Sequence, residues 1–182
     1  MDKLPLSLGK ITQLKKPISA RSTAEKFLQN INKHLASATP GSMLITWEIL
    51  GLNSQGGLPS TYFDIIRLID NGVPKSSVDH FSDSLSIPMT SIAPLLNMSY
   101  KTLTRKKKNE RFDSIVSSQI FEIACTYAKA FEVFKDRDKV TRWFNKPNKA
   151  LNGQHPFALL HTATGTKLVN QVLGRIQEGV YS

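Results

Sequence analysis

Residues 143–182, WFNKPNKALNGQHPFALLHTATGTKLVNQVLGRIQEGVYS, form the most informative segment of the chain. They contain two short helical patterns separated by residues that stop or turn a helix. These residues are Pro147, Gly153, Pro156, Gly165, Gly174 and Gly179. The segment carries no catalytic constellation and ends in a small, mostly uncharged tail. It therefore predicts a compact helical surface that binds other macromolecules.

Length and composition limit the class of protein. The chain has 182 residues, enough for one good hydrophobic core or two small ones. No apolar run approaches the ~20 residues that span a bilayer, and we expect no secretory signal. Cys125 is the only cysteine, which excludes an internal disulfide and fits a reducing compartment. We expect a cytoplasmic protein with no membrane partner.

The net charge of +10 is unevenly spread along the chain. Residues 1–35 carry +5, residues 36–98 carry −3, residues 99–112 carry +5 and residues 113–182 carry +3. A basic cluster of fourteen residues directly after an acidic region predicts a polyanionic partner. The alternative is an ordinary solvated run of charge.

Residues 1–59 are expected to form a basic N-terminal arm and an accessory segment. A capping box at Ser22 and Glu25 predicts a helix after the arm. Its apolar face would comprise Ala24, Phe27, Leu28, Ile31 and Leu35. The run 43–50 (MLITWEIL) has a strand-like composition but also fits a short buried helix, and the sequence leaves both open.

From residue 60 onward the patterns are consistently helical, so the predicted fold class is all-α. Cap residues and prolines divide residues 60–107 into four helices. The first would begin at Thr61 and Asp64 and bury Phe63, Ile66 and Ile69. The second would follow Pro74 and bury Val78, Phe81 and Leu85. The third would follow Pro88, carry Ile92, Leu95 and Leu96, and end at Asn97; Ser99 would cap the fourth, residues 100–107.

Residues 113–182 predict a second helical domain. A long helix over 113–134 would bury one stripe, with Cys125 beside it as a small hydrophobic residue. The stripe comprises Ile115, Ile120, Ile123, Ala124, Tyr127, Phe131 and Phe134. A short helix with Val140, Trp143 and Phe144 follows a corner at residues 136–138. Pro156 opens another short helix, and Thr162 caps the last.

Residues 86–111 (SIPMTSIAPLLNMSYKTLTRKKKNER) have the spacing of a DNA-binding helix-turn-helix. Ile92 and Leu96 would pack the first helix, and Leu103 would anchor the second. The outward residues of the second helix could reach base edges, and the basic residues after it could neutralise phosphates. The candidate DNA-binding residues are Ser99, Tyr100, Lys101, Thr102, Arg105, Lys106, Lys107, Lys108 and Arg111.

Two features weigh on this interpretation. An ordinary αα-hairpin with a solvated basic end would give the same local pattern. Pro94 also falls inside the first helix, where it removes a backbone donor and should bend or shorten the helix.

Together with this motif, the C-terminal pattern resembles the Xre/MbcA/ParS family of antitoxins, over about residues 60–182. The matching residues are Trp143, Pro147, Ala150, Leu151, Gly153, Pro156, Leu159, Leu160, Thr162, Gly165, Val169, Leu173, Gly174, Arg175, Ile176 and Gly179. The chain departs from the family at residues 135–138, where a corner with glycine is more usual, and at Asn97, where a turn glycine is common.

The resemblance implies a two-part protein with an Xre-like helix-turn-helix domain at 60–112 and a toxin-binding domain at 113–182. It implies two partners, operator DNA and a RES-like, NAD-consuming toxin, and a homodimer or a larger complex with the toxin. The final residues would enter or cross the toxin's NAD-binding cleft. The implied toxin-binding residues are Trp143, Arg175, Gly179, Val180, Tyr181 and Ser182.

Two other classes of function remain alternatives. The chain could be a stand-alone helix-turn-helix regulator whose C-terminal domain only oligomerises. Catalysis is not expected, because Asp136, Asp138, His155 and His161 fall where caps are common and no nucleophile or phosphate loop accompanies them. The four histidines, which also include His34 and His80, are scattered and lack cysteine partners. We therefore expect neither a metal nor a cofactor.

Overall fold

The computed structural model describes residues 26, 41–52, 57–59 and 61–180. Within them the chain is helical, with one isolated bridge between Pro74 and Arg111 and no strand, which confirms the all-α prediction. Among the described residues, no helix has the length and apolar character needed to cross a membrane. The N-terminal helix predicted after Ser22 lies outside the described residues, Lys26 excepted.

The helices follow one another with short connections. In chain order they are α2 (Gly41–Ile49), α3 (Tyr62–Asn71), α4 (Lys75–Leu85), α5 (Met89–Leu95), α6 (Tyr100–Arg105), α7 (Ser114–Phe134), α8 (Arg137–Phe144), the 3₁₀ turn η2 (Lys149–Leu151), α9 (Pro156–Leu159) and α10 (Ala163–Gln177). The run 43–50 is therefore part of a helix, which settles the open alternative. The helix predicted over 100–107 ends earlier, at Arg105.

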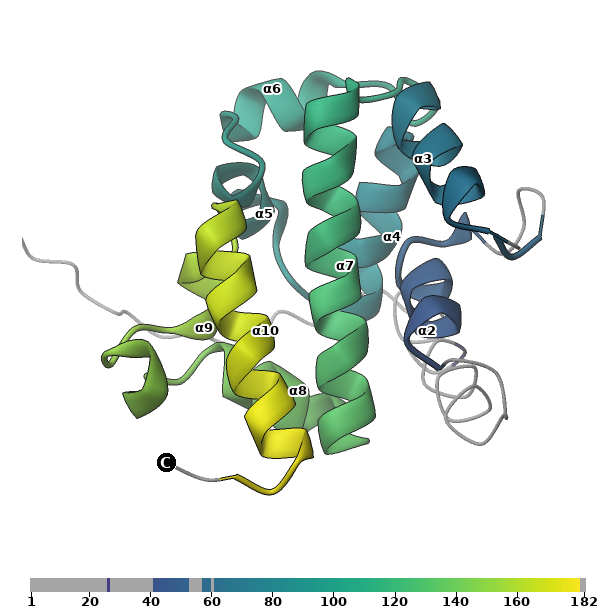
Figure 1. Ribbon diagram of the computed structural model, residues 1–182. Coiled ribbons are helices and arrows are strands. Elements are labelled where there is room, and N and C mark those ends of the chain that lie inside the picture. The colour runs from purple at the N-terminus through teal and green to yellow at the C-terminus, as the bar shows by residue number, and fades with distance from the viewer. Residues whose placement is uncertain (1–25, 27–40, 53–56, 60, 181–182) are drawn as a thin grey trace, which may run out of the picture.

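Helix α7 is the centre of the molecule, with α2 and α3 on one side and α10 on the other (Figure 1). Tyr127 of α7 meets Phe81 of α4 edge-on, with 5.4 Å between ring centroids, and stacks on Phe144 of α8 at 4.0 Å. One continuous core therefore runs from α2 to α10 and includes the helices on both sides of the predicted domain boundary.

Helices α7 and α10 run parallel, as their contacts show. Gln119 near the start of α7 bonds the carbonyl of His161, just before α10, at 3.1 Å. Further along, Asn170 donates to Thr126 at 2.9 Å, and Lys129 donates to the Asn170 carbonyl at 3.0 Å. The two helices therefore begin near one another and end near one another.

The predicted buried face of α3 is wrong. Phe63 is 71% exposed and Ile66 is 50% exposed, whereas Ile65 is buried and Leu68 is partly buried. The predicted residues are three apart, and a step of three falls about 60° short of a full turn, so that stripe drifts around the helix. Ile69, the last of the predicted set, does pack against the core.

The prediction that Ile115 belongs to the core stripe of α7 is also wrong: the residue is 80% exposed. It lies five residues before Ile120, about 140° away around the helix. The stripe continues instead through Ser117, which is fully buried. Its hydroxyl accepts the Val73 N–H at 2.8 Å and donates to the Phe112 carbonyl at 3.3 Å, so this polar group is satisfied inside the core.

Both departures from the family pattern fall on left-handed backbone. Lys135 caps α7 with a φ of 50°, and Asn97 ends α5 with a φ of 53°. Glycine adopts this conformation without the steric cost that other residues bear. The fold therefore keeps both corners without glycine.

Candidate nucleic-acid interface and carboxyl-terminal surface

Helices α5 and α6 are joined by the tight turn that the sequence predicts. The N–H of Met98 bonds the Ala93 carbonyl and that of Asn97 bonds the Pro94 carbonyl, both at 3.1 Å. This pattern is a Schellman motif with Asn97 in its left-handed position. Ser99 then caps α6 by accepting the N–H of Thr102 at 3.0 Å. The turn is thus specified by side chains and backbone together.

Pro94 is accommodated in the seven-residue helix α5. It lies in the last turn, so the bond lost is the one that its missing N–H would make to Thr90. Its side chain is exposed and its carbonyl accepts the Asn97 N–H. The expected shortening therefore leaves the turn intact.

Leu103 fixes α6 against the rest of the domain. It is 0% exposed, whereas Tyr100, Lys101, Thr102 and Arg105 are exposed around it. The structure therefore presents four of the nine predicted DNA-binding side chains on one short helix, and a fifth, Ser99, caps it. The Ser99 hydroxyl is bonded to Thr102 Oγ1 at 2.8 Å as well as capping the helix, so both hydroxyls already have local partners.

The Lys106 side chain interacts with neighbouring side chains of the same segment. Its ammonium donates to Glu110 Oε1 at 2.6 Å and lies 5.2 Å from the centre of the Phe112 ring. Glu110 Oε2 also accepts the N–H of Lys107 at 3.2 Å. The Lys106 hydrogen bond, together with that N–H, lowers the pKa of the Glu110 carboxyl. Glu110 is therefore an anion at neutral pH that competes with phosphate for Lys106.

Glu110 is the only acidic residue in 99–112, so replacing it tests whether the basic cluster binds DNA. We expect Glu110→Gln to raise operator affinity several-fold, because Lys106 becomes free to neutralise a phosphate. The slope of log affinity against log salt should steepen by up to ~0.9, the value for one more phosphate contact. Titration of labelled operator DNA at several salt concentrations measures both, and an unchanged slope would show that Lys106 does not face the duplex.

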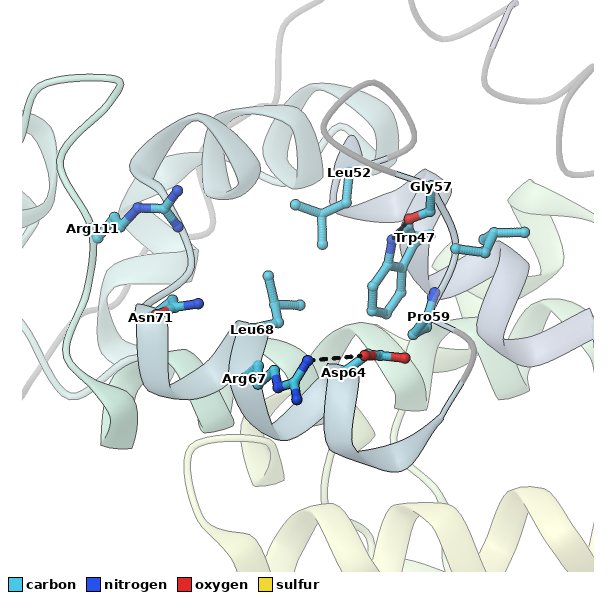
Figure 2. Close-up of a pocket in the computed structure, with 10 residues that line it drawn as sticks. Trp47, Leu52, Gly57, Pro59, Asp64, Arg67, Leu68, Asn71 and Arg111 are labelled. Atoms are coloured by element: carbon cyan, nitrogen blue, oxygen red, sulfur yellow. Dashed lines mark hydrogen bonds and ion pairs between the residues drawn. The ribbon is translucent and has the colours of Figure 1, made fainter.

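Arg111 also has a partner within the chain. Its Nη1 donates to the Gly72 carbonyl at 2.6 Å, and it lines a pocket of about 710 Å³ bounded by Trp47, Leu68 and residues 57–59 (Figure 2). In the described residues no carboxylate lies within 4.0 Å of Lys101, Arg105, Lys107 or Lys108. These four cations are the ones best placed for phosphate.

The linker after α6 is pinned to the start of α4. The N–H groups of Lys75 and Ser76 donate to the Glu110 and Lys108 carbonyls at 2.8 and 2.9 Å. These donors would otherwise be unsatisfied at the helix N-terminus, where Pro74 provides no side-chain cap. This contact could not be predicted from the sequence, because it joins segments more than thirty residues apart.

Gln119 connects the turn of the helix-turn-helix to the C-terminal region. Its Nε2 bonds the carbonyls of Leu95 and His161, and its Oε1 accepts from Asn97 Nδ2 at 3.4 Å. Asn97 Nδ2 also lies 3.4 Å from the His161 carbonyl. The sequence does not mark Gln119 as functional, since an isolated glutamine on a helix belongs to no motif.

The end of α10 is capped and projects outward. The N–H of Val180 bonds the Arg175 carbonyl at 2.9 Å, and that of Gly179, whose φ is 73°, bonds the Ile176 carbonyl at 3.1 Å. This Schellman motif turns the chain away from the helix axis. Arg175 and Gly179 are exposed and Val180 is 54% exposed, whereas Tyr181 and Ser182 lie outside the described residues.

Trp143 lies on the outward side of α8 and is only partly buried. Its ring centroid is 5.7 Å from that of Phe134 and 5.1 Å from that of Phe144. Among the predicted toxin-binding residues that the structure describes, it is thus the one that packs against other aromatic rings. Trp143 and the end of α10 lie at the same end of α7. Helix α8, which carries Trp143, begins three residues after α7 ends. Near the end of α10, Gly174 lies beside Lys129 of α7, whose Nζ would be 3.4 Å from a Cβ at that glycine.

The two predicted binding regions lie at opposite ends of α7 (Figure 1). Helix α6 precedes the start of α7, and α8 and the end of α10 lie beside its last turn. A helix of 21 residues is ~30 Å long at 1.5 Å per residue.

Cys125 does not form part of either region. Burial raises the pKa of its thiol to about 11, so it is protonated at neutral pH. Its sulfur accepts from Thr46 Oγ1 at 3.7 Å. Within the part of the chain that the structure describes, no three His, Cys, Asp or Glu side chains are grouped to hold a metal ion.

Comparison with known proteins identifies both regions. Residues 64–124 match the antitoxin Xre-like helix-turn-helix domain, and residues 129–179 match the antitoxin Xre/MbcA/ParS C-terminal toxin-binding domain. The first range ends and the second begins within α7, with residues 125–128 between them.

Three relatives named antitoxin Xre support the match. The protein from Yersinia enterocolitica is 28% identical over 138 residues, and that from Photorhabdus laumondii is 22% identical over 138 residues. Each alignment covers 75% of this chain and 90% of the relative. The Pseudomonas putida protein is 34% identical over 79 residues, which cover 42% of this chain and 50% of the relative. The chain belongs to the Xre/MbcA/ParS antitoxin family, with an Xre-like helix-turn-helix domain ahead of its toxin-binding domain.

Proposed function

We propose that this chain is the antitoxin of a type II toxin–antitoxin pair whose toxin is a RES-like, NAD-consuming enzyme. Helix α6 would bind the operator of its own operon, and the end of α10 would bind the toxin and block its NAD-binding cleft. The observation that carries the proposal is the placement of exposed α6 and the exposed end of α10 at opposite ends of α7. DNA and toxin can then be bound without sharing a surface.

The end of α10 supports the toxin-binding part of the proposal. The exposed guanidinium of Arg175 can pair bidentately with a carboxylate or phosphate. Gly179 turns the chain away from the helix axis and Val180 is 54% exposed, so Val180 can reach a partner. We assign Tyr181 and Ser182, which follow it in the sequence, to the same contact.

Repression would require two copies of the chain. Helix-turn-helix proteins bind DNA as dimers whose recognition helices lie about 34 Å apart, or a multiple of that. We propose a homodimer on the operator, joined by toxin into a larger complex.

Co-expression with the product of the neighbouring gene tests this function. We expect that product to be toxic alone, to deplete cellular NAD, and to be neutralised by the full chain. Removing residues 178–182, or introducing Arg175→Glu, should abolish rescue of growth while operator binding persists. Lys167→Glu is the matched control, because it makes the same charge change at an exposed site near the other end of α10.

The outcomes separate the parts of the proposal. A neighbouring product that is harmless alone, or that forms no complex, would contradict antitoxin function and favour a stand-alone regulator. A toxic product that leaves NAD unchanged would contradict only the RES-like assignment. Rescue by the truncated chain would show that the tail is not the toxin contact.

A further inference from the structure

A groove on α8 carries chemistry that neither α6 nor the end of α10 uses. It has a volume of about 480 Å³ and lies between the last residue of α7 and the segment after α8. Its lining residues are Phe134, Lys139, Arg142, Trp143, Lys146, Pro147 and Asn148. Aromatic rings form its wall, and cations surround them.

The helix places these residues on one face. Lys139, Arg142, Trp143 and Lys146 follow spacings of three, one and three, which group them on one side of α8 and its end. The opposite side carries Val140 and Phe144, which are buried. The basic face is therefore fixed by the packing of α8 on the core, and Trp143 is held between Phe134 and Phe144.

The cations of the groove lack partners in the described part of the chain. No carboxylate there lies within 4.0 Å of Lys139, Arg142 or Lys146, whereas Arg67, Lys75 and Lys106 each have one. Asp136, the acid just before the helix, instead accepts the backbone N–H of Lys139 at 2.7 Å. The groove thus presents positive charge that the described residues do not neutralise.

The position and the charge of the groove limit which molecules can bind in it. An operator duplex bound by α6 would lie at the other end of α7, ~30 Å away by helix length. The chain's own N-terminal 35 residues carry +5 and would be repelled. The groove instead shares its end of α7 with the end of α10, which carries Arg175 and Val180, the proposed toxin contacts.

We propose that the α8 groove is a second docking site for the toxin, and that it takes an acidic segment bearing an aromatic or aliphatic side chain. Arg142 and the two lysines pair with carboxylates, and Trp143 packs against the apolar side chain. Cations at the rim speed association, and a partly exposed tryptophan at the centre slows dissociation. This inference rests on the proposed antitoxin function.

The test is binding of the purified full-length chain to the purified product of the neighbouring gene. Lys139→Glu/Arg142→Glu should weaken binding ~10–100-fold, mostly through a slower association rate, and should flatten its salt dependence. Trp143→Ala should weaken it through faster dissociation, and Trp143→Phe should restore most of the affinity. The charge-matched control is Arg67→Glu/Lys167→Glu, with both sites exposed and away from the groove. Thermal unfolding by circular dichroism confirms that each variant folds.

Any result other than the expected one overturns the inference, and the four possible results can be told apart by experiment. Wild-type affinity in the groove variant, with the wild-type chain binding normally, contradicts the docking site and leaves the proposed function standing. Absence of binding by the wild-type chain itself contradicts both. Unchanged toxin binding with weakened operator binding makes the groove a nucleic-acid surface. Unchanged toxin binding with altered mass by light scattering makes it a contact between copies of this chain.

Discussion

Gly165→Ala is expected to destabilise the protein by about 3 kcal/mol and to abolish toxin neutralisation. Gly165 is buried in the first turn of α10, where the end of α9 presses against it. A Cβ there would overlap the carbonyl oxygen of Leu159 and lie 2.9 Å from Thr162 Oγ1, the cap of the helix. The overlapping group is backbone, so the joint between α9 and α10 must move.

Calorimetry or circular dichroism measures this effect, and the same helix supplies its control. We expect the melting temperature to fall by roughly 6–12 °C, at about 2–4 °C per kcal/mol for a chain of this size. At Gly174 a Cβ would meet only Lys129 Nζ, at 3.4 Å. Gly174→Ala should therefore stabilise the helix by about 0.5–1 kcal/mol. Equal melting temperatures for the two variants would contradict the tight α9–α10 joint.

Lys101→Glu/Arg105→Glu is expected to reduce operator affinity at least ~100-fold and to leave toxin neutralisation unchanged. Both side chains are exposed on α6 and lack a carboxylate within 4.0 Å among the described residues. Reversing them removes two phosphate contacts, so the salt slope should fall by ~1.8. Neutralisation should survive because the end of α10 lies ~30 Å away along α7.

Operator titrations at several salt concentrations, together with growth rescue, test this separation. Arg67→Glu/Lys167→Glu changes the net charge equally on other surfaces and should leave both activities near wild type. If Lys101→Glu/Arg105→Glu also abolished growth rescue, although it leaves the end of α10 and the α8 groove unchanged, DNA binding and toxin binding would be linked. Gln119, which joins the turn before α6 to His161, would then be the first residue to test.

The caps and ends of the helices could be predicted because they depend on neighbouring residues. Thr61, Ser99, Asp113 and Thr162 all accept the backbone N–H three residues on. Asn97 adopts the left-handed backbone expected of it. The helix-turn-helix and the family followed from this local punctuation.

Burial was harder to predict where both faces of a segment are apolar. Every residue from Leu44 to Leu50 is buried, Thr46 and Glu48 included, so these residues of α2 form no exposed polar face that would mark a helical period. In α3, Phe63 and Ile66 are as apolar as Ile65 and Leu68, and only packing against α7 selects between the two faces. The pattern of one segment cannot supply that choice.

Contacts between distant segments gave no signal in the sequence. Arg111 looks like a free cation of the basic run, yet its guanidinium donates to the carbonyl of Gly72, 39 residues earlier in the chain. The α8 groove is similarly assembled from Phe134 of one helix and Trp143 of the next. Their roles depend on how the helices are placed, which residue types alone do not determine.

Helix α7 also sets the angle, about its own axis, between the elements at its two ends. Each residue of an α-helix advances ~1.5 Å and rotates the chain ~100°. Helix α8 packs on α7, and the turn before α6 is tied to α7 through Gln119, so the 21 residues of α7 set the rotation of α8 relative to α6. A toxin carried at one end would thus face a set azimuth around the DNA double helix.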